Sequence, residues 1–417
     1  MKKKIKVLVL ADHPFSPSGV GTQSRYIIES LLSTGDYSFV CFGGAIKHTD
    51  YKPQKLDQYG DDLIIYPVDG YGSPESVRSI IRTAKPDMLW FMTDPRFFPW
   101  LWEIEDEIRS LIPMVYYHVW DNYPYPKYNK VWYDSNDVVV AISKVTYDIV
   151  KTVSPDVESY YLPHSVNPRY FSCVDDEDRA ELRRNMDIPE NKFVVFWNNR
   201  NARRKQPGSL MFWFDEFLKK VGKKNAMLIM HTDPMDPNGP NLVAVIDELG
   251  LVDGEIQISR EKIDFPQMAA LYNAADVTVN ISDAEGFGLS TLESLSCGTP
   301  IIVTMTGGLQ EQVTNGKDWF GVGIEPSSKA VIGSQEIPYI YEDRINKDDF
   351  INALMKIYNL SQEERKLMGQ KGLKHVEEEY NFENYTLTWD KILKDVHEKY
   401  GSWENRKHYD HWELLEI

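Results

Sequence analysis

Residues 277–303 read VTVNISDAEGFGLSTLESLSCGTPIIV, and this stretch decides the fold class. The apolar run Val277–Ile281 predicts a buried strand, and the segment Ser290–Ser296 predicts a helix. A second β-rich run, Pro300–Val303, follows the helix directly. Parallel neighbours in a sheet need a crossover connection, and a helix between two strands supplies it. The stretch therefore predicts parallel α/β architecture.

The same alternation of short apolar runs and helical patterns continues toward both ends of the chain. A first series of predicted strands comprises Ile5–Leu10, Ser38–Phe42, Leu63–Tyr66, Met88–Phe91, Met114–Tyr117 and Val138–Ile142. A second series comprises Phe193–Trp197, Ala226–Met230, Glu255–Ile258, Val277–Ile281, Pro300–Val303 and Gly321–Ile324. Two such series predict two Rossmann-like, doubly wound domains facing a cleft at the carboxyl ends of their strands.

The length of 417 residues agrees with two domains of about 200 residues each. We expect residues 1–170 to form the first domain and residues 171–381 the second. A C-terminal helix within residues 382–417, clearest as an amphipathic pattern over Phe382–Tyr400, should complete the first domain. The segment Lys329–Tyr341 fits no βα unit, and we interpret it as an insertion.

Composition excludes several classes of protein. The net charge of −17 argues against nucleic acid as the main partner and weakens the case for an anionic membrane, although a local basic patch would still allow peripheral contact. No apolar run approaches the roughly 20 residues that span a bilayer. Three scattered cysteines suit a reducing cytoplasm and offer no zinc cluster. We expect a cytoplasmic protein without a transmembrane segment, and its oligomeric state stays open.

The loop between the strand and the helix of the opening stretch is built to approach a ligand. Its glycines remove side chains from the backbone, and the first amides of a helix are unpaired and lie at the positive end of its dipole, where phosphate binds. The glycines are Gly286 and Gly288, and the amides concerned belong to Phe287, Gly288, Leu289 and Ser290. One turn further, the Glu293 carboxylate could accept hydrogen bonds from two neighbouring hydroxyl groups, as on a ribose.

Helix capping offers a simpler interpretation of part of this loop. Ser290 and Glu293 have the spacing of a capping box, and an isolated motif of that kind favours a purely structural role. Capping does not account for the two glycines or for Glu285 upstream. We therefore interpret the loop as a ligand site.

A basic turn follows the first predicted strand of the second domain. Four cations stand within six residues, at Arg200, Arg203, Arg204 and Lys205. Arginine offers a planar fork for phosphate oxygens and lysine a point charge, so the turn suits a pyrophosphate. For any single one of these cations, a solvated surface position is an equally good interpretation.

Two features of the first domain are weaker candidates. The loop around Gly19 and Gly21 lacks the third glycine of a dinucleotide fingerprint, and no acidic residue ends the next strand, which excludes a nicotinamide site. A backbone approach to phosphate or sugar and a structural turn both remain open. His118 ends a predicted strand, where a ligand contact is favoured, although a lone histidine is more often structural.

Together these motifs resemble the retaining nucleotide-sugar glycosyltransferases of family four, which have the GT-B fold and an E-x7-E motif. The resemblance is carried by Leu271–Val277, Glu285–Leu289, Glu293–Pro300 and Gly307–Glu311 in the family's order, and by Val139–Ser143 and Leu162–Asn167. It implies that the first domain lies on the acceptor side and that the second binds the nucleotide sugar. It covers nearly the whole chain and leaves the transferred sugar open.

The resemblance also implies roles for single residues. Arg200 and Lys205 look like the pair that holds the donor pyrophosphate, Glu293 like the ribose ligand, and Glu285 like the residue near the sugar hydroxyls. His118 looks like the histidine close to the donor sugar, and Gly19 and Gly21 like the loop by the phosphates and acceptor. The expected catalytic residues are Glu285, His118, Arg200 and Lys205.

The chain departs from the family's pattern in two places that affect the donor site. Asn199 stands where a glycine is usual, and the crowding by Arg203 and Arg204 leaves open which cations contact phosphate. The nucleobase region at Ile258–Arg260 lacks the usual glycine, so the base is open too. We include Asn199, Arg204 and Arg260 among the expected donor-binding residues.

The expected activity is transfer of a sugar, with retention at the anomeric carbon, from a nucleotide-diphosphate sugar to a glycan, lipid or small-molecule acceptor. The donor is a co-substrate, and neither a cofactor nor a metal ion is expected. Two alternatives remain. One is a nucleotide-sugar epimerase or phosphorylase on the same fold, and the other is a catalytically silent carbohydrate- or nucleotide-binding protein.

Overall fold

The structure is a computed structural model that describes residues 3–410 of the chain and divides them into two compact units. The first unit contains the chain up to Trp120, the segment Tyr125–His164 and the segment that begins at Glu383. The second contains Asp121–Pro124 and Ser165–Phe382. The sequence placed the boundary after residue 170, whereas the long continuous segment of the second unit begins at Ser165. Residues 411–417, part of the expected C-terminal helix, lie outside the described residues.

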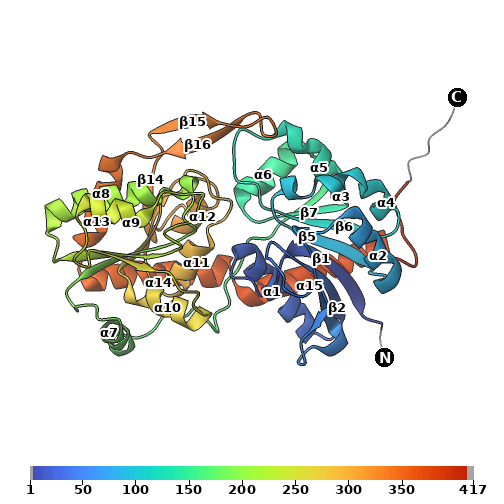
Figure 1. Ribbon diagram of the computed structural model, residues 1–417, viewed down its shortest axis with the longest axis horizontal. Helices are drawn as coiled ribbons and strands as arrows, with labels where there is room; N and C mark the ends of the chain where they lie inside the picture. Colours follow the sequence, from blue (N-terminus) through green and yellow to red (C-terminus); the bar gives the residue numbers. More distant parts are fainter. Residues whose placement is uncertain (1–2, 411–417) are drawn as a thin grey trace. The chain divides into compact units, whose positions relative to one another are not determined.

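The described part of the first unit contains an eight-stranded sheet in the order β3-β4-β2-β1-β5-β6-β7-β8 (Figure 1). Its strands are β1 (Ile5–Asp12), β2 (Tyr37–Gly44), β3 (Gln54–Lys55), β4 (Leu63–Pro67), β5 (Met88–Met92), β6 (Met114–His118), β7 (Val138–Ala141) and β8 (Glu158–Tyr161). Only β3 runs antiparallel to its neighbour in this sheet. Every residue of β5, β6 and β7 is buried, as expected of parallel strands covered on both faces.

Seven α-helices belong to the described part of the first unit. They are α1 (Gly19–Ser33), α2 (Pro74–Ala84), α3 (Pro99–Glu103), α4 (Glu105–Arg109), α5 (Lys130–Asp134), α6 (Lys144–Val153) and α15 (Phe382–Tyr400). The amphipathic helix predicted over Phe382–Tyr400 is confirmed with these bounds, and it packs on the first unit (Figure 1). The buried Trp389 ring lies 4.9 Å from the ring of Tyr117 and 5.9 Å from that of Trp90.

The second unit contains, among the described residues, a six-stranded parallel sheet in the order β11-β10-β9-β12-β13-β14. Its strands are β9 (Phe193–Asn198), β10 (Ala226–His231), β11 (Ile256–Ser259), β12 (Val277–Asn280), β13 (Ile301–Thr304) and β14 (Gly321–Ile324). Its helices are α7 (Asp176–Asn185), α8 (Pro207–Val221), α9 (Leu242–Leu249), α10 (Phe265–Ala274), α11 (Leu289–Ser296), α12 (Leu309–Val313), α13 (Lys347–Tyr358) and α14 (Gln362–Glu379). The α/β class with two parallel sheets is confirmed.

The segment that the sequence could not assign to a βα unit forms a hairpin. Strand β15 (Ser328–Ile332) pairs antiparallel with β16 (Ile340–Arg344), and the two make a separate two-stranded sheet (Figure 1). The short segment Asp121–Pro124 of the same unit continues this pairing, because Tyr123 and Tyr341 form an antiparallel bridge. The side-chain amide of Asn122 also donates a hydrogen bond to the carbonyl of Tyr341 at 3.1 Å.

Candidate donor-binding site

The strand order of the second unit fixes where its ligand site lies. From β9 the chain moves outward to β10 and β11 on one side, and from β12 to β13 and β14 on the other. The direction of winding therefore reverses between β9 and β12, which are paired neighbours. Doubly wound sheets bind ligands at the carboxyl ends of strands at such a switch point. The loop after β9 holds the basic turn, and the loop after β12 holds Glu285 and the glycines.

The structure brings the end of the basic turn to the glycine loop. Residues Arg203–Lys205 form one turn of 3-10 helix, η4. The ammonium group of Lys205 forms an ion pair with the carboxylate of Glu285, and both side chains are nearly buried. The Arg204 guanidinium donates a hydrogen bond to the carbonyl of Ala284 at 2.6 Å and lies 3.6 Å from the Asp121 carboxylate. Two cations thus meet the Glu285 loop.

Electrostatics keep the Glu285 carboxylate charged. Burial alone would raise the pKa of Glu285, but Lys205 and Arg204 outweigh it and hold that pKa below its ordinary value. Burial lowers the pKa of Lys205, and Arg204 acts in the same direction, while Glu285 opposes both. The cations Lys205 and Arg204 face two carboxylates, those of Glu285 and Asp121, so the charges of this cluster balance.

The other two cations of the turn face elsewhere. The Arg200 guanidinium, 65% exposed, donates a hydrogen bond to the Asp236 carboxylate at 2.6 Å. This partner holds the pKa of Asp236 at about 2. Arg203 donates two hydrogen bonds to Glu342 on β16. The structure therefore groups Lys205 with Glu285 and does not group Arg200 with them. The predicted joint contact of Arg200 and Lys205 with a pyrophosphate stays a prediction.

The glycine loop leads into α11 without the capping box that was the simpler interpretation. Helix α11 begins at Leu289, and its N-cap is Gly288 with φ of 94°. No side chain among the described residues caps it. Ser290 and Glu293 both lie inside the helix, so neither occupies the position that a capping box requires. The amides of the first turn remain available to a ligand at the end of the loop.

A second pair of glycines explains why the loop is held so close to its neighbours. A Cβ atom on Gly307, where φ is 49°, would lie 1.7 Å from the carbonyl oxygen of Glu285. One on Gly308 would lie 2.7 Å from the carbonyl oxygen of Gly286. Gly307 and Gly308 were noted in the sequence only as a family landmark. Their positions in the sequence do not predict this backbone contact, because it depends on the path that the chain takes after β13.

Glu293 lies behind the loop on α11 and is partly buried. The Tyr272 hydroxyl donates a hydrogen bond to one of its carboxylate oxygens at 2.7 Å, and Asn198 donates to that hydroxyl at 2.8 Å. Burial raises the pKa of Glu293 to about 7, and the bond from Tyr272 opposes this only in part. Sequence reasoning missed Tyr272 and Asn198. The assignment of Glu293 to a ribose stays a prediction.

The remaining predicted donor residues of the second unit follow strands. Asn199 comes directly after β9 and is half-buried, whereas Arg260 comes directly after β11 and is exposed. Both therefore stand at the carboxyl edge of the sheet, as predicted. Among the described residues, neither of them forms a hydrogen bond or ion pair with Glu285, and their roles stay predictions.

The predicted residues of the first unit have local roles. His118 ends β6 fully buried, its Nε2 lies 2.8 Å from the Tyr133 hydroxyl oxygen, and burial lowers its pKa to about 3. Gly21 lies in the first turn of α1, where a Cβ atom would meet Ser16 Oγ at 2.3 Å. The structural-turn interpretation of Gly21 therefore has direct support. Contacts of His118, Gly19 and Gly21 with a donor or acceptor stay predictions.

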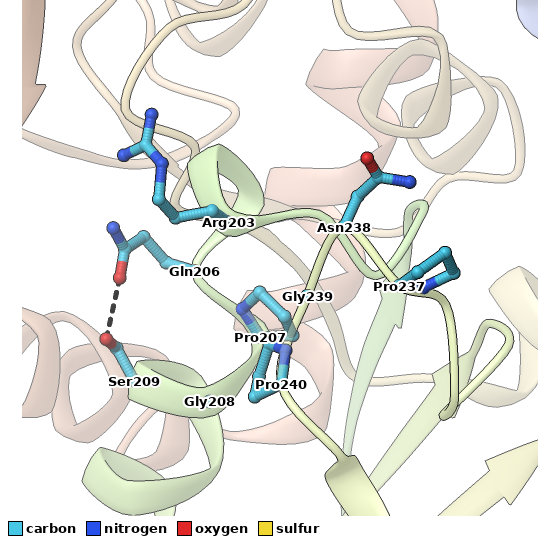
Figure 2. Close-up of a pocket in the computed structure, with 9 residues that line it drawn as sticks. All are labelled: Arg203, Gln206, Pro207, Gly208, Ser209, Pro237, Asn238, Gly239 and Pro240. Carbon is cyan, nitrogen blue, oxygen red and sulfur yellow. Dashed lines mark hydrogen bonds between the residues drawn. The ribbon is translucent and has the colours of Figure 1, made fainter. Parts of the chain in front are cut away.

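A cavity of about 320 Å³ lies beside η4 (Figure 2). Figure 2 shows the start of α8 on one side and the loop Pro237–Pro240 on another, with Arg203 and Gln206 above. The Ser209 hydroxyl donates a hydrogen bond to the Gln206 side chain at 2.7 Å. Lys205 and Glu285 do not line this cavity. It adjoins the basic turn without containing the paired groups.

Residues 3–410 contain no group of three or more His, Cys, Asp or Glu side chains arranged to hold a metal ion. None of the helices described is both long and apolar enough to cross a membrane.

Comparison with known proteins identifies the second unit. Residues 178–375 match the family model described as glycosyl transferases group 1. All of the matched residues lie in the second unit. The matched residues include Lys205, Glu285 and Glu293. The resemblance noted from the motifs of the sequence is thereby confirmed at the level of the family.

Curated relatives of this chain align over part of their length. D-inositol 3-phosphate glycosyltransferase of Corynebacterium jeikeium is 30% identical over 40% of this chain and 41% of its own. N-acetyl-alpha-D-glucosaminyl L-malate synthase of Bacillus anthracis is 23% identical over 63% of this chain and 61% of its own. The chain thus spans less than two thirds of the length of either relative.

Solved structures match this chain over nearly all of its length. Sucrose-phosphate synthase from Thermosynechococcus elongatus has a TM-score of 0.74 at 16% identity, covering 94% of this chain and 99% of that one. Anabaena HepE in complex with UDP-glucose has a TM-score of 0.66 at 16% identity, with 94% and 99% covered. At this identity the likeness concerns the fold. The predicted GT-B fold class is confirmed.

Proposed function

We propose that this group 1 glycosyltransferase transfers a sugar from a nucleoside-diphosphate sugar to an acceptor, with retention at the anomeric carbon and without a metal ion. One observation carries the proposal. Lys205 and Arg204 converge on the Glu285 loop at the start of α11, at the switch point of the sheet. Cations and unpaired helix amides on two adjacent loops form the arrangement that a diphosphate needs.

The same groups would serve the chemistry. When the bond between the sugar and the diphosphate breaks, negative charge grows on the leaving phosphate oxygens. Lys205, Arg204 and the first amides of α11 would stabilise that charge more in the transition state than in the ground state. An acceptor hydroxyl would attack from the face that the diphosphate leaves, and a phosphate oxygen would take its proton. The bond formed and the bond broken then lie on the same face, which gives retention.

We propose a uridine nucleotide as the first donor to test. HepE is described in complex with UDP and with UDP-glucose, and its fold is similar to that of this chain. Glu293, which accepts from Tyr272 on one oxygen, would accept from ribose hydroxyls on the other. The identity of the base needs a comparison of UDP, GDP and ADP in the same assay.

The test combines binding and product analysis on the full chain. We expect UDP or another nucleoside diphosphate to raise the melting temperature in the presence of EDTA, because a ligand that prefers the native state stabilises it. Lys205→Ala should weaken binding of the diphosphate by about 10- to 100-fold, as expected for loss of a charge-assisted contact. Lys220→Ala, an exposed lysine near the end of α8, is the matched control and should bind as the wild type.

Product analysis then decides the reaction class. Transfer to an acceptor with an unchanged anomeric configuration, measured by NMR, supports the proposal. An inverted product would contradict retention. Donor turnover without any acceptor would indicate an epimerase, and dependence on free phosphate would indicate a phosphorylase. A silent binding protein would bind the nucleotide and show no turnover with any acceptor tested, and its Glu285→Gln variant would bind as the wild type does.

A further inference from the structure

A second cluster of charges lies on the side of η4 that faces the hairpin. Its centre is Glu342 on β16, whose side chain is 5% exposed. Glu342 accepts two hydrogen bonds from the guanidinium of Arg203, at 2.6 and 2.8 Å. A third comes from Arg344, two residues along the same strand, at 2.8 Å. A buried carboxylate with three charge-assisted donors is a built arrangement, because burying it unpaired would be costly.

Asp283 joins this cluster to the loop that carries Glu285. Its side chain is 3% exposed, forms an ion pair with Arg344 and accepts a hydrogen bond from Gln206 at 2.7 Å. Its backbone is held on both sides. The Asp283 amide donates to the carbonyl of Arg204, and the Asp343 amide donates to the carbonyl of Asp283, both at 2.8 Å. The hairpin, η4 and the loop after β12 therefore form one connected network.

The geometry of η4 links the directions of its three side chains: once one of them is fixed, the other two must point to other sides. A 3-10 helix has about three residues per turn, so consecutive side chains point roughly 120° apart. When Arg203 is fixed on Glu342, Arg204 and Lys205 must point to other sides. They contact the carbonyl of Ala284 and the carboxylate of Glu285. The sequence left open which cations of the basic turn would contact phosphate. In the structure, Glu342 binds Arg203, whereas Arg204 and Lys205 contact the Glu285 loop.

We infer that Glu342 is a positioning residue for the donor diphosphate, and that the β15–β16 hairpin aims Arg204 and Lys205 at the Glu285 loop by holding Arg203. This inference rests on the proposed function, since it assigns the diphosphate to Arg204 and Lys205. It gives a role to the segment that fits no βα unit. Burial alone would raise the pKa of Glu342, but Arg203 and Arg344 keep that pKa below its ordinary value, so the carboxylate stays charged at neutral pH.

The test measures binding of two probes, inorganic pyrophosphate and UDP, to the full chain by calorimetry. Glu342→Gln keeps the size of the side chain and removes its charge. We expect it to weaken binding of both probes by about 5- to 20-fold, because Arg203 then competes with Arg204 for the same space. Glu336→Gln, an exposed glutamate in the same hairpin, is the matched control and should change binding less than twofold.

A merely structural role of Glu342 predicts a different pattern. It would lower the melting temperature, while the folded protein would bind both probes as the wild type does. Arg203→Lys, which loses the planar fork, should weaken binding to a similar extent, and the double variant with Glu342→Gln should be no weaker than either single variant. With an acceptor in hand, we expect the loss mainly in KM for the donor.

The outcomes separate the two proposals. Weaker binding of both probes by Glu342→Gln and Arg203→Lys, with Glu336→Gln unchanged, supports the inference. Wild-type binding by Glu342→Gln overturns the inference and leaves the proposed function standing. A wild-type chain that binds neither pyrophosphate nor any of UDP, GDP and ADP overturns the proposed function, and the role of Glu342 in donor binding falls with it.

Discussion

At the scale of single residues, the site is defined by which charges already have partners. Lys205 is paired with Glu285 and Arg200 with Asp236, so a diphosphate has to compete with a carboxylate for each cation. The two competitions differ in strength. The pair of Lys205 and Glu285 is nearly buried, whereas the Arg200 side chain is largely exposed and screened by solvent.

The pair of Arg200 and Asp236 gives a prediction about donor affinity. If Arg200 contacts phosphate, then Asp236→Asn removes its competitor and should strengthen binding of UDP by up to about fivefold, the range of a solvent-exposed ion pair. Titration calorimetry measures this. The double variant Arg200→Ala with Asp236→Asn should bind no better than Arg200→Ala alone. Unchanged or weaker binding by Asp236→Asn would show that Arg200 has no part in the diphosphate site.

Glu293 gives a prediction about pH. Its pKa is about 7 in the folded chain, well above its ordinary value, because burial disfavours the charged form. Between the ordinary pKa of a glutamate and a pKa of about 7, the folded state binds more protons than the unfolded state. The free energy of unfolding therefore falls as the pH rises through this range. The loss of stability is complete above pH about 7. Glu293→Gln removes this titration. We compare the change in the free energy of unfolding that Glu293→Gln causes at pH 8 with the change that it causes at pH 4.5. The change at pH 8 should be more stabilising by on the order of 1–3 kcal/mol.

Urea denaturation at the two pH values checks this expectation. Glu248→Gln, an exposed glutamate on α9, controls for the general effect of removing a carboxylate. An equal effect of Glu293→Gln at both pH values would mean that burial does not disfavour the charged form of the carboxylate. If Glu293 binds the ribose, as proposed, the same titration should weaken donor binding below pH 7, since only the ionised carboxylate could accept from both ribose hydroxyls.

At the scale of elements, the glycine loop is held by the backbone of the segment before α12. Gly307 and Gly308 touch the carbonyl groups of Glu285 and Gly286, and Gln312 on α12 donates a hydrogen bond to the carbonyl of Phe287 at 2.8 Å. The Thr291 hydroxyl donates to the Gln312 side chain at 2.6 Å and ties α11 to the same point. The loop that would hold phosphate is thus fixed before any ligand arrives, which lowers the entropy cost of binding.

We predict that Gly307→Ala displaces this loop. The added methyl group would meet the Glu285 carbonyl oxygen at 1.7 Å, and φ of 49° adds its own strain. We expect a loss of about 2–4 kcal/mol of stability together with loss of nucleotide binding. Gly316→Ala isolates the backbone term, because φ is 87° there and no atom lies within 4 Å of the added group. Equal losses of stability in the two variants, with nucleotide binding intact in Gly307→Ala, would contradict the prediction.

The elements that sequence reasoning found and those it missed differ in a physical way. Strands β5, β6 and β7 are continuous buried apolar runs, and this pattern predicted them as strands. Strand β8 has the sequence ESYY and no fully buried residue, and β3 has only two residues, so neither carries a hydrophobic signal. In β15 and β16, charged residues such as Glu342 point inward to other charges. Their partners are distant in sequence, and no local pattern could reveal them.

The site shows the same division. The motif around Glu285 and the basic turn were both predicted, and the contact of Lys205 with Glu285 follows from two loops at one switch point. The pairing of Arg200 with Asp236 was not predictable, since Asp236 lies in a proline-rich loop that gave no sign of its direction. The choice between a capping box and a ligand loop depended on where α11 begins, a boundary that sequence patterns fix only within a few residues.

At the scale of the whole molecule, the first unit is assembled from distant parts of the chain. Helix α15 packs on its sheet, with Trp389 fully buried against Trp90 and Tyr117. The Tyr37 hydroxyl donates a hydrogen bond to the Asp390 carboxylate at 2.9 Å. These contacts are those of a core helix of the first unit. They are not those of a detachable tail.

We predict that Trp389→Ala destabilises the first unit by about 3–5 kcal/mol, the usual cost of a large cavity in a core. Hydrogen exchange followed by mass spectrometry should show faster exchange in β1, β5 and β6. The strands β9 and β12 of the second unit should keep their protection. Trp319→Ala, an exposed tryptophan that is 48% accessible, is the control and should leave both units unchanged. Faster exchange of β9 and β12 in Trp389→Ala would mean that the units do not unfold separately.

The position of α15 also sets an order for biosynthesis. The ribosome releases the strands of the first unit early, but the helix that covers Trp90 and Tyr117 leaves the exit tunnel only after the entire second unit has been made. The second unit can therefore finish folding while the first still exposes an apolar face. A premature stop codon shortly before Phe382 would spare every residue of the basic turn and the glycine loop, yet yield a chain whose earlier half never closes its core.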